Sequence, residues 1–247
     1  GVLMGLFRVR SFTQDDAHIF CMREQIEDES VAIIDYIDAV MKRFGFGDAI
    51  AMSVSTRPEK FIGEPADWDA ATEALKSALT KTGHGGFKVN LGEGAFYGPK
   101  IEVRIRDSPK REWQCGTVQV DFSMPKRLGA EYVGADGARH TPIMIHRAIV
   151  GSIERFIGIL IEHYGGKFPA WLAPVQALVI PVKGDIHGDY ARRVVAELKA
   201  TGVRAELDRT EETLGKRIRN GTMQKIPYML VVGEKEAAAG AVAVRTR

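Results

Sequence analysis

The sequence contains little cysteine, and its two thiols, Cys21 and Cys115, exclude a fold held together by a framework of disulfides. That scarcity fits a reducing, cytoplasmic setting. No apolar run approaches the roughly 18 residues that a membrane-spanning helix needs. The N-terminus has neither the basic-then-apolar pattern of a signal peptide nor the acid-poor pattern of a transit peptide. The sequence therefore favours a cytoplasmic globular protein.

A strong net charge is also missing, since 34 Lys and Arg stand against 32 Asp and Glu. The balance nevertheless differs along the chain. Residues 1–172 have 21 basic and 23 acidic side chains, whereas residues 173–247 have 13 and 9. The positive excess is confined to the C-terminal part, which points mildly to a polyanionic partner there. A solvated surface with a chance imbalance explains the same numbers equally well.

The length of the chain favours two domains, and a change of pattern suggests where they meet. The segment FPAWLAPVQ, residues 168–176, places two prolines after a helical run. We predict a first domain over residues 1–172 and a second over residues 173–247. Because the chain opens with Gly1 inside a predicted loop, we expect that further residues precede it in the natural protein.

The first domain is predicted to be an antiparallel α+β fold. Alternating apolar and polar residues indicate strands, and apolar residues at helical spacing indicate helices. The predicted strands cover residues 6–14, 17–23, 48–56, 100–107, 114–122 and 140–146. The predicted helices cover residues 24–45, 67–83 and 148–166. Many strands with few crossover units favour antiparallel pairing.

The second domain is predicted to be a small mixed or parallel α/β domain. Its strands are short and almost wholly apolar, as in a sheet that is buried on both faces. They cover residues 177–182, 203–207, 228–233 and 242–247. Predicted helices cover residues 186–201 and 213–224.

A polar cluster surrounds His18 in the segment RSFTQDDAHIF. Side-chain alternation along a strand places Asp16 and His18 on one face, with Arg8 and Arg10 further back on it. Such a face is too polar for a core, and it suits a ligand that carries phosphate and amine groups. A single histidine on a strand is nevertheless more often a packed or surface residue.

His146, which ends the segment HTPIMIH, is a second candidate for a site. Two neutral imidazoles are suitable zinc ligands, but zinc normally takes three or four protein ligands. Neither Cys21 nor Cys115 is clearly placed to add one. A capping or packing role for His146 therefore remains open.

Uncharged and cationic groups mark three further stretches. Glycines around Tyr97 and Lys100 predict a constrained loop that brings a cation and the backbone close to a ligand, although a tight turn with aromatic packing is equally possible. The amides of Gln114 and Gln119 suit the orientation of an amino acid or a ribose. Arg155 either pairs with a neighbouring carboxylate at the surface or lies beneath a nucleotide.

Five segments together resemble the class II threonyl-tRNA synthetases. RVRSFTQDDAHIF, residues 8–20, resembles the second half of class II motif 2, and HRAIVGSIERFIGIL, residues 146–160, resembles motif 3. EGAFYGPKIE and QCGTVQVDF are similar to the strands between these motifs, and FPAWLAPVQ resembles the passage into the anticodon-binding domain. The resemblance runs nearly end to end. It implies a partial class II catalytic domain followed by an anticodon-binding domain.

The resemblance also implies a role for each matching residue. In the first domain these roles are ATP binding for Arg8, Gln114 and Arg155; amino-acid binding for Asp16, Tyr97, Gln114 and Gln119; catalysis for Lys100 and Arg155; and zinc binding for His18 and His146. In the second domain Arg219, Lys225, Glu236 and Arg245 are expected to bind tRNA.

The reaction implied is ATP-dependent attachment of threonine to tRNA(Thr) through a threonyl-adenylate, with Mg²⁺ accompanying ATP. In this family zinc recognises the amino group and hydroxyl of threonine, which excludes valine. Serine keeps the hydroxyl, so editing elsewhere is expected. The parent protein is expected to be a homodimer.

The chain departs from the family pattern at three places. A cysteine that is the third zinc ligand, motif 1 and the first strand of motif 2 would precede Gly1, and the chain also ends sooner than the family does. We therefore expect the longer parent protein, and not this polypeptide, to activate threonine. The family's R-N-E-K run appears as TEET, residues 210–213, and Glu211 in place of asparagine puts one base contact in doubt.

Two other functions remain as alternatives. Prolyl- and glycyl-tRNA synthetases share the anticodon-binding fold, but the histidine of QDDAHIF argues against them. A synthetase-like protein that binds RNA or regulates without catalysis would differ only in the upstream segment.

Overall fold

The computed structural model describes residues 2–47, 49–106 and 111–247, and the chain divides into two compact units, Gly1–Leu160 and Ile161–Arg247. The boundary predicted between residues 172 and 173 falls later along the chain than this division. The predicted strands 48–56 and 100–107 each include one residue that lies outside the described ranges. Within those ranges, no helix is both long and apolar enough to cross a bilayer.

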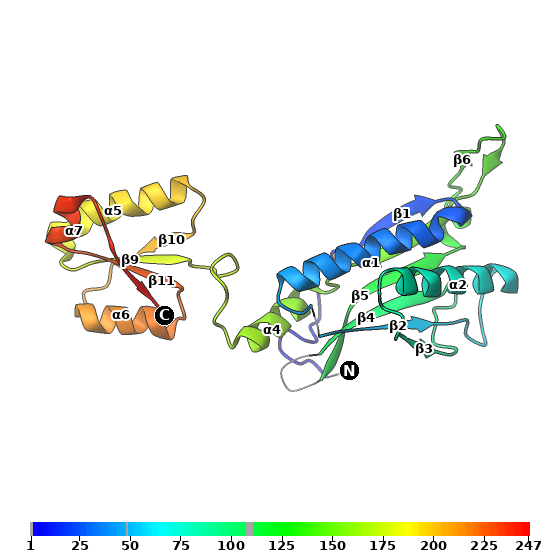
Figure 1. Cartoon of the computed structure of the whole chain (residues 1–247), viewed down its shortest axis with the longest axis horizontal. Helices are drawn as coiled ribbons and strands as arrows, with labels where there is room; N and C mark the ends of the chain where they lie inside the picture. The colour runs from blue at the N-terminus through cyan, green and yellow to red at the C-terminus, as the bar shows by residue number, and fades with distance from the viewer. Residues whose placement is uncertain (1, 48, 107–110) are drawn as a thin grey trace. The chain divides into compact units, whose positions relative to one another are not determined.

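The first unit is built on a six-stranded sheet with the strand order β1-β8-β5-β4-β2-β3 (Figure 1). In that order the strands are Ala17–Cys21, Ile143–Ala148, Glu112–Asp121, Lys100–Arg106, Ile50–Ser55 and Lys88–Asn90. Every neighbouring pair is antiparallel except β2 and β3, which are parallel. The antiparallel α+β fold predicted from the sequence is confirmed.

Two helices, α1 (Ile26–Arg43) and α2 (Pro65–Lys81), pack against each other and against the sheet. Strand alternation directs the fully buried Ile101 and Val118 to the apolar face of the sheet. The polar residues that flank Ile101 and Val118 along their strands therefore lie on the opposite face of the sheet. That second face is where the candidate site forms.

Several short elements of the first unit were not predicted from the sequence. They are a 3-10 helix at Arg23–Gln25, the strand β3, the helix α3 (Met124–Arg127), and the small strand pair β6 (Tyr132–Val133) and β7 (Arg139–His140). Each is four residues or shorter, so its pattern is too brief to show a period.

Two predictions about local structure were wrong. Among the described residues, the segment 6–14 forms isolated bridges and no strand, and a turn at Gly5, where φ is 47°, precedes it. The helix predicted from residue 148 begins at Ile153, as α4 (Ile153–Tyr164). Strand β8 continues to Ala148, and Gly151 then turns the chain with φ of 71°. A Cβ atom at Gly151 would lie 2.3 Å from the carbonyl oxygen of Cys115.

The second unit has a four-stranded sheet with the order β10-β9-β11-β12. The strands in that order are Ala205–Leu207, Ala177–Pro181, Tyr228–Val232 and Ala243–Thr246. Strand β9 is parallel to β10 and β11, whereas β12 is antiparallel to β11, so the mixed α/β prediction is confirmed. Helices α5 (Gly184–Ala200) and α6 (Leu214–Met223) lie on opposite faces (Figure 1). A short helix α7 (Glu234–Ala239) was not predicted.

Candidate functional site

Four polar side chains from four strands form a row across the open face of the first sheet. Lys100 on β4 is the register partner of Gln119 on β5, and Gln119 is the partner of His146 on β8. His146 in turn is the partner of His18 on β1. Register partners on neighbouring strands carry their side chains on the same face, about 5 Å apart. The pairing therefore brings together residues that the sequence assigned to catalysis, amino-acid binding and zinc.

The two histidines meet at one end of this row. Their ring centroids are 4.7 Å apart, with the planes at 79°. The ring of Tyr97 lies 6.0 Å from that of His146. The carboxylate of Asp16 lies 3.8 Å from Nε2 of His18, with 43% of the Asp16 side chain exposed. The residues predicted to bind the amino acid and the metal therefore share one neighbourhood.

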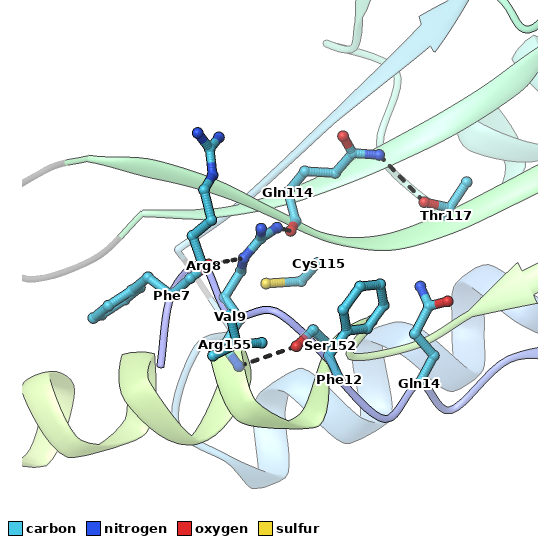
Figure 2. A pocket seen from close by; sticks show the side chains of 11 residues that line it. Phe7, Arg8, Val9, Phe12, Gln14, Gln114, Cys115, Thr117, Ser152 and Arg155 are labelled. Carbon is cyan, nitrogen blue, oxygen red and sulfur yellow. Dashed lines mark hydrogen bonds between the residues drawn. The ribbon is translucent and has the colours of Figure 1, made fainter. Parts of the chain in front are cut away.

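Two adjacent cavities lie beside the row. One, of about 210 Å³, is lined by Asp16, Tyr97, Gln119 and His146 among others. The other, of about 240 Å³, is lined by Arg8, Gln114 and Arg155 among others (Figure 2). Both cavities include Gln14, Cys115 and Thr117 in their walls. Three of the four residues predicted to bind the amino acid thus line the smaller cavity, whereas the fourth, Gln114, lines the larger one together with the other two residues predicted to bind ATP.

Arg155 lies on the wall of the larger cavity in a fixed orientation (Figure 2). Its Nε donates to the carbonyl oxygen of Phe7 at 3.0 Å, and its Nη1 donates to that of Gln114 at 3.0 Å. The neighbouring carboxylate of Glu154 instead accepts hydrogen bonds from the backbone of Thr13. These contacts of Glu154 and Arg155 are therefore not those of a surface ion pair between the two side chains.

Asp15 connects the segment before β1 to the turn after β8, a role that the sequence did not reveal. Its carboxylate accepts hydrogen bonds from the backbone N–H groups of Ile149, Val150 and Gly151, the shortest at 2.9 Å. The two segments that line the larger cavity are thereby held to each other. The signal in the sequence was only a pair of adjacent acids, and pairing across 134 positions is not a local pattern.

Burial keeps two of the lining side chains protonated. It raises the pKa of the Cys115 thiol to about 12, so Cys115 is a neutral thiol at ordinary pH in the metal-free chain. Burial, together with the negative charges of Asp121 and Asp16, raises the pKa of the Tyr97 hydroxyl. Tyr97 therefore remains a hydrogen-bond donor in the smaller cavity.

The arrangement fits part of a zinc site. Two facing imidazoles are ligands that zinc prefers, and Nε2 of His146 also meets a buried carboxylate, that of Asp121, at 2.9 Å. Among the described residues, however, no group of three or more His, Cys, Asp or Glu is placed to hold a metal ion. The described residues therefore bring together two groups that could serve as zinc donors, fewer than the three or four protein ligands that zinc normally takes. Sequence reasoning missed Asp121.

In the second unit, the four residues predicted to bind tRNA do not form one cluster. Lys225 precedes strand β11 and Glu236 follows it, so they lie at opposite ends of the sheet. The carboxylate of Glu236 accepts a hydrogen bond from the N–H of Gly233, at the start of α7. Arg219 is exposed on α6. Arg245 lies on β12, where it is the register partner of Met229 on β11.

A cavity of about 420 Å³ lies instead at the carboxyl ends of β9 and β10. Helices α5 and α6 leave these strand ends toward opposite faces, which is where α/β sheets commonly bind ligands. The lining includes Glu211, whose departure from the family pattern was noted, together with Asp208, Arg209 and Arg217. These last three were missed because strand order is not visible in a local pattern.

Comparisons with known proteins agree with this organisation. The family model of the class II tRNA synthetase core domain (G, H, P, S and T) matches residues 2–164. The model of the anticodon binding domain matches residues 176–247. The two matches therefore cover separate stretches of the chain.

Several threonine enzymes match the chain over all or nearly all of its length. Threonine–tRNA ligase of Methylococcus capsulatus is 55% identical over 247 residues, which are 100% of this chain and 38% of that protein. The Thermotoga maritima ligase is 53% identical with the same coverage. The crystal structure of the RNA binding domain of threonyl-tRNA synthetase from Cryptosporidium parvum matches with a TM-score of 0.92 at 42% identity, covering 99% of this chain and 60% of that one.

The chain thus spans 38% of the length of these curated relatives. Its core-domain match covers more than half of the residues, and the two cavities beside the polar row lie within that match. The chain belongs to the class II aminoacyl-tRNA synthetases and is similar along its whole length to the threonine enzymes.

Proposed function

We propose that the longer protein of which this chain forms a part attaches threonine to tRNA(Thr) in an ATP-dependent reaction through a threonyl-adenylate. The observation that carries the proposal is the row Lys100–Gln119–His146–His18 beside a cavity walled by Arg155. A shared wall between the two cavities lets an amino-acid carboxylate and the α-phosphate of ATP lie next to each other. In-line attack needs that juxtaposition.

Arg155 is the proposed phosphate-binding group. Two backbone carbonyls already hold its guanidinium, so little side-chain freedom remains to be lost when ATP binds. Arg8 is exposed and lies in the same cavity wall, where it adds a second positive charge. Adenylation then depends on positioning and on neutralising phosphate charge with these arginines and the Mg²⁺ that accompanies ATP.

Asp16, Tyr97 and Gln119 are the proposed threonine-binding groups of the smaller cavity. The carboxylate of Asp16 suits the ammonium of the substrate, and Tyr97 and Gln119 offer hydrogen bonds. Zinc, held by His18 and His146 with a ligand from outside this chain, would serve to recognise threonine by coordinating its amino group and hydroxyl. A purely apolar pocket separates such isosteres as threonine and valine by only about a hundredfold.

The second unit is the proposed tRNA-reading part. We propose that Arg219, Lys225, Glu236 and Arg245 contact the anticodon region, although they occupy different sides of this unit. RNA loops are read by polar contacts to splayed bases. The affinity for tRNA should fall as salt is added, because phosphate contacts release counterions. An affinity that does not change with salt would mean that this surface is wrongly assigned.

The deciding experiment combines metal analysis with threonine-dependent pyrophosphate exchange in the longer protein. We expect about one zinc per chain and exchange with threonine, weak exchange with serine and very little with valine. We expect no exchange from the 247-residue chain alone, because it supplies only two zinc donors within its described residues. Stoichiometric zinc without exchange would instead support a non-catalytic RNA-binding protein.

A further inference from the structure

We propose that Asp121 is a positioning residue that holds His146 as the Nε2–H tautomer and leaves Nδ1 as the nitrogen available to a metal. The metal part of this inference rests on the proposed function. The tautomer part rests only on the hydrogen bonds of this chain. The two parts are therefore tested separately.

The contact between the two residues is short and shielded from water. Oδ2 of Asp121 lies 2.9 Å from Nε2 of His146. The side chain of Asp121 is 4% exposed and that of His146 is 22% exposed. An ionised carboxylate only accepts hydrogen bonds, so the nitrogen that faces it has to carry the hydrogen. In a neutral imidazole the other nitrogen, Nδ1, then has the lone pair.

The other carboxylate oxygen keeps Asp121 from turning. Oδ1 accepts hydrogen bonds from the backbone N–H groups of Ser123 at 2.7 Å and Met124 at 2.9 Å. Backbone N–H groups are donors in every state, so they always require an acceptor at this position. Oδ2 is consequently directed at the histidine by the fold itself.

The second histidine of the row, His18, has no comparable contact to a carboxylate within the part of the chain that the structure describes. His18 meets Asp16 only at 3.8 Å, which is longer than a hydrogen bond, and both side chains are more than 40% exposed. Of the two histidines, only His146 therefore has a carboxylate, that of Asp121, within hydrogen-bond distance among the described residues. Ligand histidines in metal sites commonly donate their second N–H to such a carboxylate, which sets the tautomer.

Asparagine at position 121 should reverse the tautomer. Its amide oxygen has to serve the N–H groups of Ser123 and Met124, because the opposite orientation would remove their acceptor and set the amide NH₂ group, itself a donor, against both of them. The amide nitrogen then donates to Nε2 of His146. Nδ1 must in turn carry the hydrogen, which blocks it as a metal ligand. Alanine removes the carboxylate without imposing either tautomer.

The first experiment measures the tautomers of the histidines in the metal-free 247-residue chain by NMR of isotope-labelled ring nitrogens, with the signals of His146 identified from His146→Gln. At mildly alkaline pH we expect Nε2–H for His146 in the natural sequence and Nδ1–H in Asp121→Asn. The Nδ1–H form in the natural sequence would overturn the inference. If Asp121→Asn does not fold, that measurement on the natural sequence still decides it.

Zinc binding by the longer protein, measured by competition with a chelator, is the second experiment. We expect Asp121→Asn to weaken zinc affinity about a hundredfold and Asp121→Ala about tenfold. Asp136→Asn is the matched control, because Asp136 also meets a histidine Nε2, that of His140, at 2.9 Å, but its side chain is 58% exposed. It should leave zinc affinity unchanged.

The order of zinc affinities in Asp121→Asn and Asp121→Ala separates an effect of the tautomer from a general disruption of the site. An alanine variant as weak as the asparagine variant, or weaker, would contradict the tautomer argument. If the natural longer protein binds no zinc while His146 is the Nε2–H tautomer, the proposed function fails and the positioning role of Asp121 stands.

Discussion

Glu102 lies against Lys100 at the inner end of the polar row, with Oε1 of the glutamate 2.6 Å from Nζ of the lysine. The other oxygen, Oε2, meets Nη2 of Arg104 at 2.7 Å. The side chain of Glu102 is only 6% exposed, so one buried carboxylate neutralises two cations. The position of Lys100 in the row therefore depends on Glu102.

Replacing Glu102 by glutamine should lower the free energy of unfolding by about 2 kcal/mol, because it leaves two partly buried cations side by side. The value is below that of a fully buried pair since Lys100 is 21% exposed. Urea unfolding measures it. Glu73→Gln is the control, because Glu73 pairs with Lys76 at the surface, and it should cost less than about 0.5 kcal/mol. Equal losses in the two variants would contradict a special role for Glu102.

Arg155→Lys should weaken ATP binding by the longer protein about tenfold or more, since lysine keeps the charge but loses the planar fork held by Phe7 and Gln114. The KM for ATP in pyrophosphate exchange reports the change. Arg139→Lys, on the small β6–β7 strand pair and 75% exposed, serves as the control and should leave that KM as it is. An unchanged KM in Arg155→Lys would remove this arginine from the nucleotide site.

Gly98→Ala should destabilise the first unit by about 3 kcal/mol, because a Cβ atom there would lie 1.7 Å from the carbonyl oxygen of Val120. Strand β5 would have to move away from the loop that carries Tyr97. Chemical unfolding followed by circular dichroism measures the loss. At Gly85 a Cβ atom has nothing within 4 Å, so Gly85→Ala should be nearly neutral. Comparable losses at both glycines would show that the close approach is not the cause.

Stability should fall as the pH rises above about 9, in part because of Cys115. Burial raises the pKa of its thiol from an ordinary 9.0 to about 12 in the folded chain. The unfolded chain therefore loses the thiol proton first, and stability that is fully present below pH 9.0 is lost as the pH approaches 12. At about pH 11 the loss should be roughly 3 kcal/mol. Cys115→Ala should show a correspondingly shallower alkaline decline in thermal unfolding, and an identical decline would refute the assignment.

Arg217→Met should lower the stability of the second unit. The guanidinium of Arg217 donates to the carbonyl of Pro181 at 2.7 Å and to the carboxylate of Asp208 at 2.9 Å, so it joins the ends of β9 and β10. Its loss leaves a buried carboxylate unpaired and should cost about 3 kcal/mol. Amide hydrogen exchange in β9 should accelerate by about a hundredfold. Arg192→Met, at an exposed pair on α5, should leave that exchange rate unaltered.

Much of the candidate site could be predicted from single segments. Alternation along one strand put Asp16 and His18 on a common face, and the glycine-rich loop around Tyr97 pointed to Lys100. Gln119 and His146 were candidates from the chemistry of their side chains, and the resemblance to a known family then gave each of these residues a role. The strand register that aligns Lys100, Gln119, His146 and His18 could not be predicted from the sequence. It depends on which strands become neighbours, and a shift by one residue would send each side chain to the other face.

Other features were hidden because their cause is not local. The alternating segment 6–14 has the composition of a strand, but its contacts are made by the backbone of Thr13 to Glu154 and by the bridge from Gln14 to Ser152. Helix α7 is six residues long, too short for a helical period to appear. Asp121 ends a strand of mixed polar and apolar residues, and its importance appears only when β5 and β8 are paired.

The row across the sheet has a consequence for how the protein reaches its working state. Its members are drawn from β4, β5, β8 and β1, and the contact between His18 and His146 closes a span of 128 chain positions. Contacts of such high sequence separation form late and slowly in folding. A newly made chain would acquire the proximity of these rings only after its long-range strand pairing is complete, so this proximity would report that folding has finished.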